Sequence, residues 1–155
     1  MALEVFGDPW SLLIVRDLMV RAYRTFKEFQ ASGEGIATNV LSDRLRRLEQ
    51  AQIVVAEREP KDRRRVIYRL TEKGIDLGPV LLELLIWGAR HEKTEAPCEV
   101  IEQMARDRDQ VLNEMRRRWR EKDPRPLLPP FGEHRQLAET LRDVSGPFEE
   151  RLGER

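Results

Sequence analysis

One predicted helix, Ala37–Gln50, carries small polar side chains of the kinds that hydrogen-bond the edges of DNA bases. Its apolar residues recur at helical spacing and mark the side that faces a core, namely Leu41, Leu45 and Leu48. Steps of about 100° per residue from Leu41 place a polar set on the opposite side. This set consists of Asn39, Ser42, Asp43 and Arg46, with Thr38 near the helix start. The outer face of this helix is therefore a candidate surface for reading a major groove.

A basic stretch follows this helix, although the chain as a whole is neutral. The 28 Lys and Arg residues balance 28 Asp and Glu residues, so net charge alone indicates no nucleic-acid partner. Between Ile36 and Lys73, however, ten basic residues oppose six acidic ones. Four of them gather at a predicted turn, namely Lys61, Arg63, Arg64 and Arg65. We expect this tip to reach phosphates or an adjacent minor groove.

Two further helices precede these residues and must position them. Asp8 and Pro9 predict the start of a helix that runs to about Val20, because Asp is a preferred N-cap and proline suits the first helical position. We interpret Asp8 as a cap rather than a catalytic group. A second, shorter helix is predicted within Arg24–Ser32, with Thr25 as its cap. The Gly-containing turn Ser32–Gly35 then leads into Ala37–Gln50, as in a helix-turn-helix.

The turn with the basic tip joins two predicted strands. Val54–Glu59 and Val66–Leu70 are rich in alternating β-branched residues and predict a hairpin. Helices followed by a hairpin and another helix indicate a winged helix-turn-helix. The predicted fold class is mainly α with a small β-hairpin wing, extended by C-terminal helices.

The most apolar stretch follows the hairpin. Thr71 predicts a cap, Pro79 a break or kink, and the helix is expected to continue to about His91. Since apolar side chains surround this helix almost completely, we expect a second subunit to cover one side. A single long amphipathic helix is predicted from Cys98 to Lys122. The predicted dimerisation set is Leu81, Leu84, Leu85, Trp87, Ile101, Met104, Leu112, Met115 and Trp119.

The chain divides into two predicted parts. Residues 1–92 form the DNA-binding domain with its dimerisation helix, and residues 93–155 form a helical extension with a dimerisation or regulatory role. A linker, Glu92–Pro97, separates them. Asp123–Pro130 is too rich in proline for a helix, and His134–Val144 predicts a last short one.

Five segments in this order resemble the HxlR-type family of winged helix-turn-helix transcriptional regulators. They are LEVFGDPWSLLIVRDL, RTFKEFQ, GIATNVLSDRLRRLEQAQIV, VIYRLTEKG and LLIWG. The resemblance covers about three fifths of the chain, from Ala2 to Glu92. It implies a homodimer on a two-fold site in double-stranded DNA, more often as a repressor. The sequence departs from the family pattern at Ala37, Asn39 and Asp43, which leaves the DNA sequence that it reads open.

The resemblance and the residue pattern together define the predicted DNA-binding set. It consists of Thr25, Lys27, Thr38, Asn39, Ser42, Asp43, Arg46, Arg47, Lys61, Arg63, Arg64 and Arg65. Arg44 lies beside the leucine stripe, and we expect it to form a structural ion pair. Arg16 and Asp17 are expected to pair on the surface. The tip with its Asp-x-Arg pattern also resembles that of MarR-type regulators.

Two alternatives remain open. In the first, the chain is a MarR-type regulator whose unknown small-molecule effector sits between dimer helices carrying Trp87 and Trp119. In the second, the winged helix binds another protein and not DNA. Asp43 and the neutral net charge support this alternative. Some relatives sense electrophiles through a cysteine just before the first helix, where this sequence has none. The single cysteine, Cys98, is not expected to act as a sensor.

Other function classes are not expected. No Ser-His-Asp set, phosphate-binding glycine loop or carboxylate pair stands out, so we predict no enzyme and no cofactor. His91 and His134 lack metal-ligand spacing, so no metal is expected. The stretch Leu77–Gly88 is too short to span a bilayer and contains Glu83. These features predict a cytoplasmic protein without a membrane partner.

Overall fold

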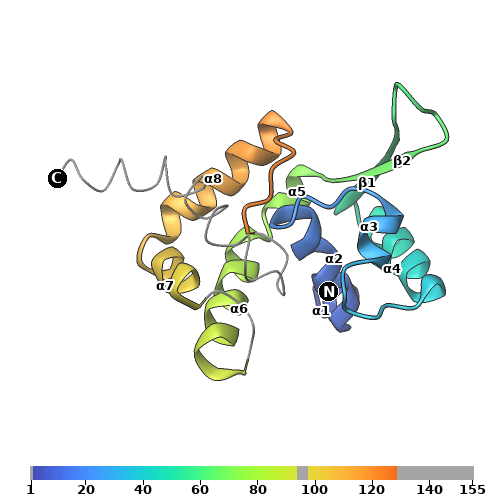
Figure 1. Cartoon of the computed structure of the whole chain (residues 1–155). Coiled ribbons are helices and arrows are strands. Elements are labelled where there is room, and N and C mark those ends of the chain that lie inside the picture. The colour runs from blue at the N-terminus through green and yellow to red at the C-terminus, as the bar shows by residue number, and fades with distance from the viewer. Residues whose placement is uncertain (1, 94–97, 129–155) are drawn as a thin grey trace.

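The computed structural model describes residues 2–93 and 98–128. Its helices are α1 (Ala2–Phe6), α2 (Pro9–Met19), α3 (Phe26–Gln30), α4 (Thr38–Gln50), α5 (Glu72–Ile75), α6 (Gly78–His91), α7 (Cys98–Arg106) and α8 (Arg108–Glu121). Its strands are β1 (Val54–Arg58) and β2 (Val66–Leu70). Figure 1 shows the hairpin projecting on the side of α3 and α4, with α7 and α8 on the other side of α6. The winged helix-turn-helix fold is confirmed, while the helix predicted at His134–Val144 lies outside the described residues.

The start of α2 forms as its sequence predicts. The Asp8 carboxylate accepts hydrogen bonds from the backbone N–H groups of Trp10 and Ser11, at 3.0 and 3.1 Å, and from the Ser11 hydroxyl at 2.7 Å. These bonds satisfy N–H groups that have no partner inside the helix. The ring of Trp10 is half-buried and packs against the core. Helix α1, which precedes this cap, was not predicted.

The pair Arg16 and Asp17 corrects one expectation about α2. The two residues do pair, with Arg16 Nη2 2.8 Å from Asp17 Oδ1, but Asp17 is only 3% exposed. Burial, the largest cause, raises the pKa of Asp17 above its ordinary value, although the charges of Arg16 and Arg21 oppose that shift. The pair is therefore buried and not on the surface. The rest of the fold covers more of α2 than the spacing of its apolar residues indicated.

Helices α3 and α4 form the helix-turn-helix. Thr25 and Glu28 cap α3 reciprocally, each side chain bonding the backbone N–H of the other. Gly33 and Gly35 in the turn have φ of 86° and 73°, which a residue with a side chain rarely adopts. The leucine stripe of α4 is buried as predicted, with Leu41, Leu45 and Leu48 no more than 2% exposed. The polar face of α4 is thereby turned outward.

The hairpin pairs its strands antiparallel, with Val54 opposite Leu70 and Arg58 opposite Val66. Its base is held close to α5. A Cβ atom on Gly74 would lie 2.3 Å from the Ile53 carbonyl oxygen, so only glycine fits there. The Thr71 hydroxyl accepts from Gly74 N–H at 3.1 Å and donates to the Gln52 carbonyl at 2.6 Å. The base of the wing is therefore fixed to the helices.

The helices after the hairpin differ from prediction at two points. The break expected at Pro79 lies earlier, at Asp76 and Leu77, and Pro79 stands in the first turn of α6, where its missing N–H costs no hydrogen bond. The single helix expected from Cys98 is divided at Asp107. The side chain of Asp107 accepts from Gln110 N–H at 3.1 Å and so starts α8 anew.

The C-terminal helices share one hydrophobic core with the winged helix. Leu82 and Ile86 of α6 meet Ile101 of α7 and Met115 of α8, all at most 3% exposed. The N–H groups of Leu127 and Leu128 bond the Val20 carbonyl, which ties the segment after α8 to the end of α2. In the described part of the chain, no helix is long and apolar enough to cross a membrane.

Candidate nucleic-acid interface

The outer face of α4 presents the residues predicted to meet base edges. Thr38, Asn39, Ser42 and Arg46 are exposed, and Asp43 is half-buried. The Gln30 side-chain amide donates to the Thr38 hydroxyl at 2.9 Å, which links α3 to the first turn of α4. Spacing along α4 did not reveal this bond, since its donor comes from another helix. The face is set by the buried leucines on the other side.

Asp43 lies among three arginines of the same helix. Its carboxylate oxygens are 2.6 Å from Arg44, 2.7 Å from Arg46 and 2.9 Å from Arg47. The hydrogen bond from Arg46 is the largest of the causes that lower the pKa of Asp43, and the charges of Arg47 and Arg44 add to it. Asp43 is therefore ionised at neutral pH. It neutralises part of the positive charge on α4 and holds the guanidinium groups to one side.

Arg44 connects α4 to α2. Its Nε lies 2.9 Å from Asp8 Oδ1, and both side chains are about four-fifths covered, being 20% and 23% exposed. The ion pair expected for Arg44 is present. It joins α4 to the cap of α2, and it leaves Arg46 and Arg47 as the outward arginines of α4.

The tip of the wing is an exposed basic turn. Lys61, Arg63, Arg64 and Arg65 are all exposed. The backbone of the turn is held from within, because Arg58 donates to the Arg63 carbonyl at 2.8 Å and Asp62 accepts from Arg64 N–H at 3.0 Å. Arg65 lies 3.3 Å from Glu59. The tip therefore offers cationic side chains on a backbone with internal support.

The two predicted contacts on α3 have different surroundings. Lys27 is exposed. The Thr25 hydroxyl accepts from Glu28 N–H and donates to the Glu28 carboxylate, at 3.4 and 2.8 Å. Thr25 therefore caps α3. A contact of Thr25 with DNA stays a prediction.

The predicted dimerisation set needs correction. Leu81, Ile101, Met104 and Met115 are at most 6% exposed within the chain's own core, so they have no surface to offer a second subunit. Leu85, Leu112 and Trp119 are partly buried against that core. The spacing that suggested an interface was produced instead by α7 and α8 packing on α6. Two of the predicted residues are well exposed, Leu84 at 47% and Trp87 at 54%, together with Val80 at 52%.

Sequence reasoning missed a group of basic side chains behind the wing. Arg24 donates to the carbonyls of Leu18 and Tyr23 and is held beside Arg69 of β2. Burial, with the charge of Arg69, lowers the pKa of Arg24 to about 10. No local pattern marks these residues, since Arg24 and Arg69 lie far apart in sequence.

Metal ligation finds no support in the described ranges, 2–93 and 98–128. No three His, Cys, Asp or Glu side chains gather there in a way that could hold an ion. Cys98, at the start of α7, is exposed, and its Sγ lies 3.8 Å from the Ala89 carbonyl oxygen.

Comparison with known sequences identifies the first three fifths of the chain. A family model described as HxlR-like helix-turn-helix matches residues 5–96. The HTH-type transcriptional regulator YodB of Bacillus subtilis is 36% identical over 99 residues, which are 63% of this chain and 88% of YodB. YvaP of the same organism, named an uncharacterized HTH-type transcriptional regulator, is 35% identical over 86 residues, or 56% of this chain and 79% of YvaP.

Several solved structures resemble a similar share of the chain. The crystal structure of PA1607 has a TM-score of 0.55 and 40% identity, over 59% of this chain and 63% of that one. The reduced form of the transcriptional regulator YodB from Bacillus subtilis has a TM-score of 0.50 and 35% identity, over 58% and 87%. The redox regulator HypR in its oxidized form has a TM-score of 0.52 and 29% identity, over 60% and 95%. Helices α7 and α8 lie beyond residues 5–96, which the family model matches.

Proposed function

The chain belongs to the HxlR-like helix-turn-helix family of transcriptional regulators, and on that basis we propose that it is a homodimeric, sequence-specific repressor. As a member of this family it is a DNA-binding regulator and not an enzyme. The observation that carries the finer proposal is the polar outer face of α4 beside the exposed basic tip of the wing. Such a protein would act where the DNA is, in the cytoplasm.

In the proposed complex, α4 enters the major groove. Asn39 and Arg46 are exposed on the helix and have side chains that make bidentate contacts, an amide with adenine and a guanidinium with guanine. Lys27 and the wing tip would contact phosphates on either side, which orients α4 without reading sequence. Asp43 supports this arrangement, because it holds Arg46 and Arg47 on the outer face.

The proposed dimer forms through α6. Val80, Leu84 and Trp87 are spaced by four and three residues, so they lie on one side of the helix, and about half of each is exposed. An apolar stripe of this kind in water favours a partner surface. A two-fold axis through α6 would place the same stripe of each subunit against the other and present two copies of α4 to successive major grooves.

The test is a DNA-binding titration with the fragment upstream of the protein's own gene, in which fluorescence anisotropy reports binding at several salt concentrations. We expect saturable binding that persists in an excess of unrelated DNA. The stoichiometry should be two chains per DNA site. A chain that binds no genomic fragment even at low salt would instead support a winged helix used for protein interaction.

We do not propose for this chain the redox regulation that is named for HypR. The one cysteine of this chain, Cys98, stands at the start of α7, beyond the residues that the family model matches. A response to a small molecule is favoured by a cavity between the wing and α8.

A further inference from the structure

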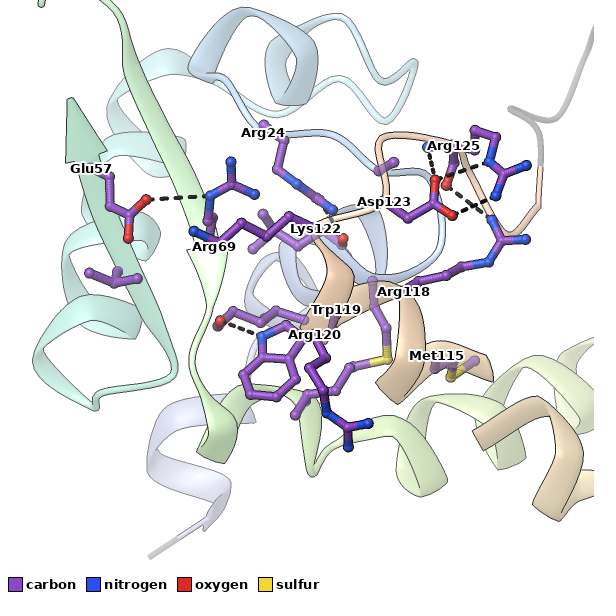
Figure 2. A pocket seen from close by; sticks show the side chains of 16 residues that line it. Arg24, Glu57, Arg69, Met115, Arg118, Trp119, Arg120, Lys122, Asp123 and Arg125 are labelled. Carbon is purple, nitrogen blue, oxygen red and sulfur yellow. Dashed lines mark hydrogen bonds and ion pairs between the residues drawn. The ribbon is translucent and has the colours of Figure 1, made fainter. Parts of the chain in front are cut away.

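A cavity of about 260 Å³ lies where the wing meets the C-terminal helices. Its walls come from three parts of the chain: the end of α2 with the segment that follows, both strands of the hairpin, and α8 with its continuation. Figure 2 shows these side chains around one hollow, with Arg24 and Arg69 near Lys122 and the ring of Trp119 in the same space. It is not the site between dimer helices that the sequence suggested for an effector, since Trp119 lines it and Trp87 does not.

The walls carry an excess of positive charge. Six basic residues and two acidic ones line the cavity. One of the acidic residues, Asp123, forms an ion pair with Arg125, whose Nη2 lies 2.8 Å from Asp123 Oδ2. The other, Glu57, has half of its side chain exposed and lies 3.4 Å from Arg69 Nε. Basic residues therefore outnumber acidic ones around the cavity, although Glu57 pairs with Arg69 and the charge of Glu28 acts on Arg24.

The guanidinium of Arg69 lies in the cavity wall close to that of Arg24. Its Nε is buried and lies 3.4 Å from the Glu57 carboxylate, an ion pair without the geometry of a hydrogen bond. Arg24 lies close enough that the charge of Arg69 lowers the pKa of Arg24. Two neighbouring guanidinium groups repel each other, and a carboxylate bound between them would offset that repulsion and accept charge-assisted hydrogen bonds.

The remaining walls are apolar and include one fixed aromatic ring. Trp119 Nε1 donates to the Leu70 carbonyl at 2.8 Å, which holds the indole in place. Leu18, Met19 and Met115 also line the cavity. A held indole and methionine sulfur atoms favour contact with a flat aromatic group.

We propose that this cavity binds a small aromatic carboxylate, with the carboxylate on Arg24 and Arg69 and the ring against Trp119. The volume suits a compound of one or two rings, since it lies just below the range of about 300–1,000 Å³ usual for ligand pockets. The regulatory part of this inference rests on the proposed function. Because β1 and β2 form one wall, the ligand would restrict the part of the hairpin beyond its fixed base and so change the affinity for DNA.

The binding test is isothermal titration calorimetry of the full chain with benzoate and 1-naphthoate, without DNA. We expect saturable binding of at least one carboxylate and none of the matching amide, benzamide or 1-naphthamide. Arg69→Met should weaken binding about tenfold or more, because a charge-assisted hydrogen bond is lost. Arg106→Ala, which removes an exposed charge on α7 outside the cavity, should bind like the unchanged chain.

A second variant guards against loss of folding in Arg69→Met. Val55→Phe keeps every charge and adds a ring to a partly exposed wall residue, so it should fill the cavity and weaken binding. The proposal is overturned if neither carboxylate binds at millimolar concentration, if the amides bind as well, or if folded Arg69→Met and Val55→Phe bind normally. Equal binding of sulfate would reduce the site to an unselective anion hole and would also overturn it.

DNA titration separates this proposal from the proposed function. If the chain binds a carboxylate but no DNA, the proposed ligand site is supported and the proposed repressor function is refuted. If it binds DNA but no carboxylate, the repressor function is supported and the ligand site is refuted.

Discussion

Arg44 Nε lies 2.9 Å from Asp8 Oδ1, and this ion pair joins α4 to the N-terminus of α2. The same carboxylate caps α2 through Trp10 and Ser11. Burial opposes ionisation of Asp8, but the hydrogen bonds from Ser11 and the contact with Arg44 outweigh it, so the pKa of Asp8 is lowered. One side chain therefore starts a helix and orients another.

Replacing Asp8 separates these two roles. Asp8→Ala removes the cap and the ion pair, and we expect a loss of about 0.5–2 kcal/mol in the free energy of unfolding, the range measured for N-caps. Asp8→Asn keeps a capping oxygen and should lose less. Urea unfolding followed by circular dichroism measures both, and equal losses would show that the ion pair, rather than the cap, dominates.

Asp43 limits the positive charge that α4 presents. Asp43→Ala should release Arg46 and Arg47, so we expect binding to unrelated DNA to rise roughly several-fold, as for loss of an exposed neutralising partner. Discrimination in favour of the proper site should fall. The matched control is Glu49→Ala, which removes an exposed acid from the same helix. A similar rise in both variants would mean that net charge alone is responsible.

The wing tip should contribute phosphate contacts. Arg63→Ala combined with Arg64→Ala should weaken binding to all DNA sequences alike and lower the slope of log affinity against log salt by about two, or about one per lost contact. Anisotropy titrations at several salt concentrations give the slope. Arg106→Ala on α7 serves as the control for a lost charge, and an unchanged slope in the double variant would exclude the wing from the interface.

The exposed stripe on α6 should hold the dimer. Leu84→Glu places a charge among apolar side chains and should weaken dimerisation about tenfold or more, the effect of losing a central contact residue. Asn113→Glu adds the same charge at an exposed position of α8 and should leave the dimer intact. Sedimentation velocity over a concentration series distinguishes them. If both variants remain dimeric, the interface lies elsewhere.

Glu114 should protect the C-terminal helices from acid. The hydrogen bond from Arg117 is the largest cause that lowers the pKa of Glu114 to about 2, and Arg118 adds to it. A carboxyl whose pKa is lower in the folded chain stabilises it fully above the unfolded value of about 4.5, and this contribution disappears as the pH falls toward about 2. Glu114→Gln should therefore narrow the stability difference between pH 6 and pH 3.

Unfolding by urea at the two pH values measures this difference. Glu99→Gln removes an exposed carboxylate from α7 and provides the control. An unchanged difference in Glu114→Gln would mean that the arginine contacts do not persist in solution.

Local sequence determined the elements that need only neighbours along the chain. Asp8 and Thr25 start their helices through backbone groups within four residues, and Leu41 with its stripe orients α4 by periodicity alone. The five-segment pattern identified the family because it contains these caps and this leucine stripe in the same order along the chain. The winged helix, the outward face of α4 and the basic tip therefore followed from the sequence.

Tertiary structure decided which apolar and charged side chains meet across the fold. Periodicity shows that a side of a helix must be covered but not by what, so Leu81 and Ile101 were assigned to a second subunit when α6 and α7 bury them in one chain. Likewise, the buried Asp17 and the cavity beside Arg69 depend on segments that are distant in sequence. The energy of such contacts depends on the distance between the groups and on their burial. The spacing of residues along the chain gives neither quantity for segments that are distant in sequence.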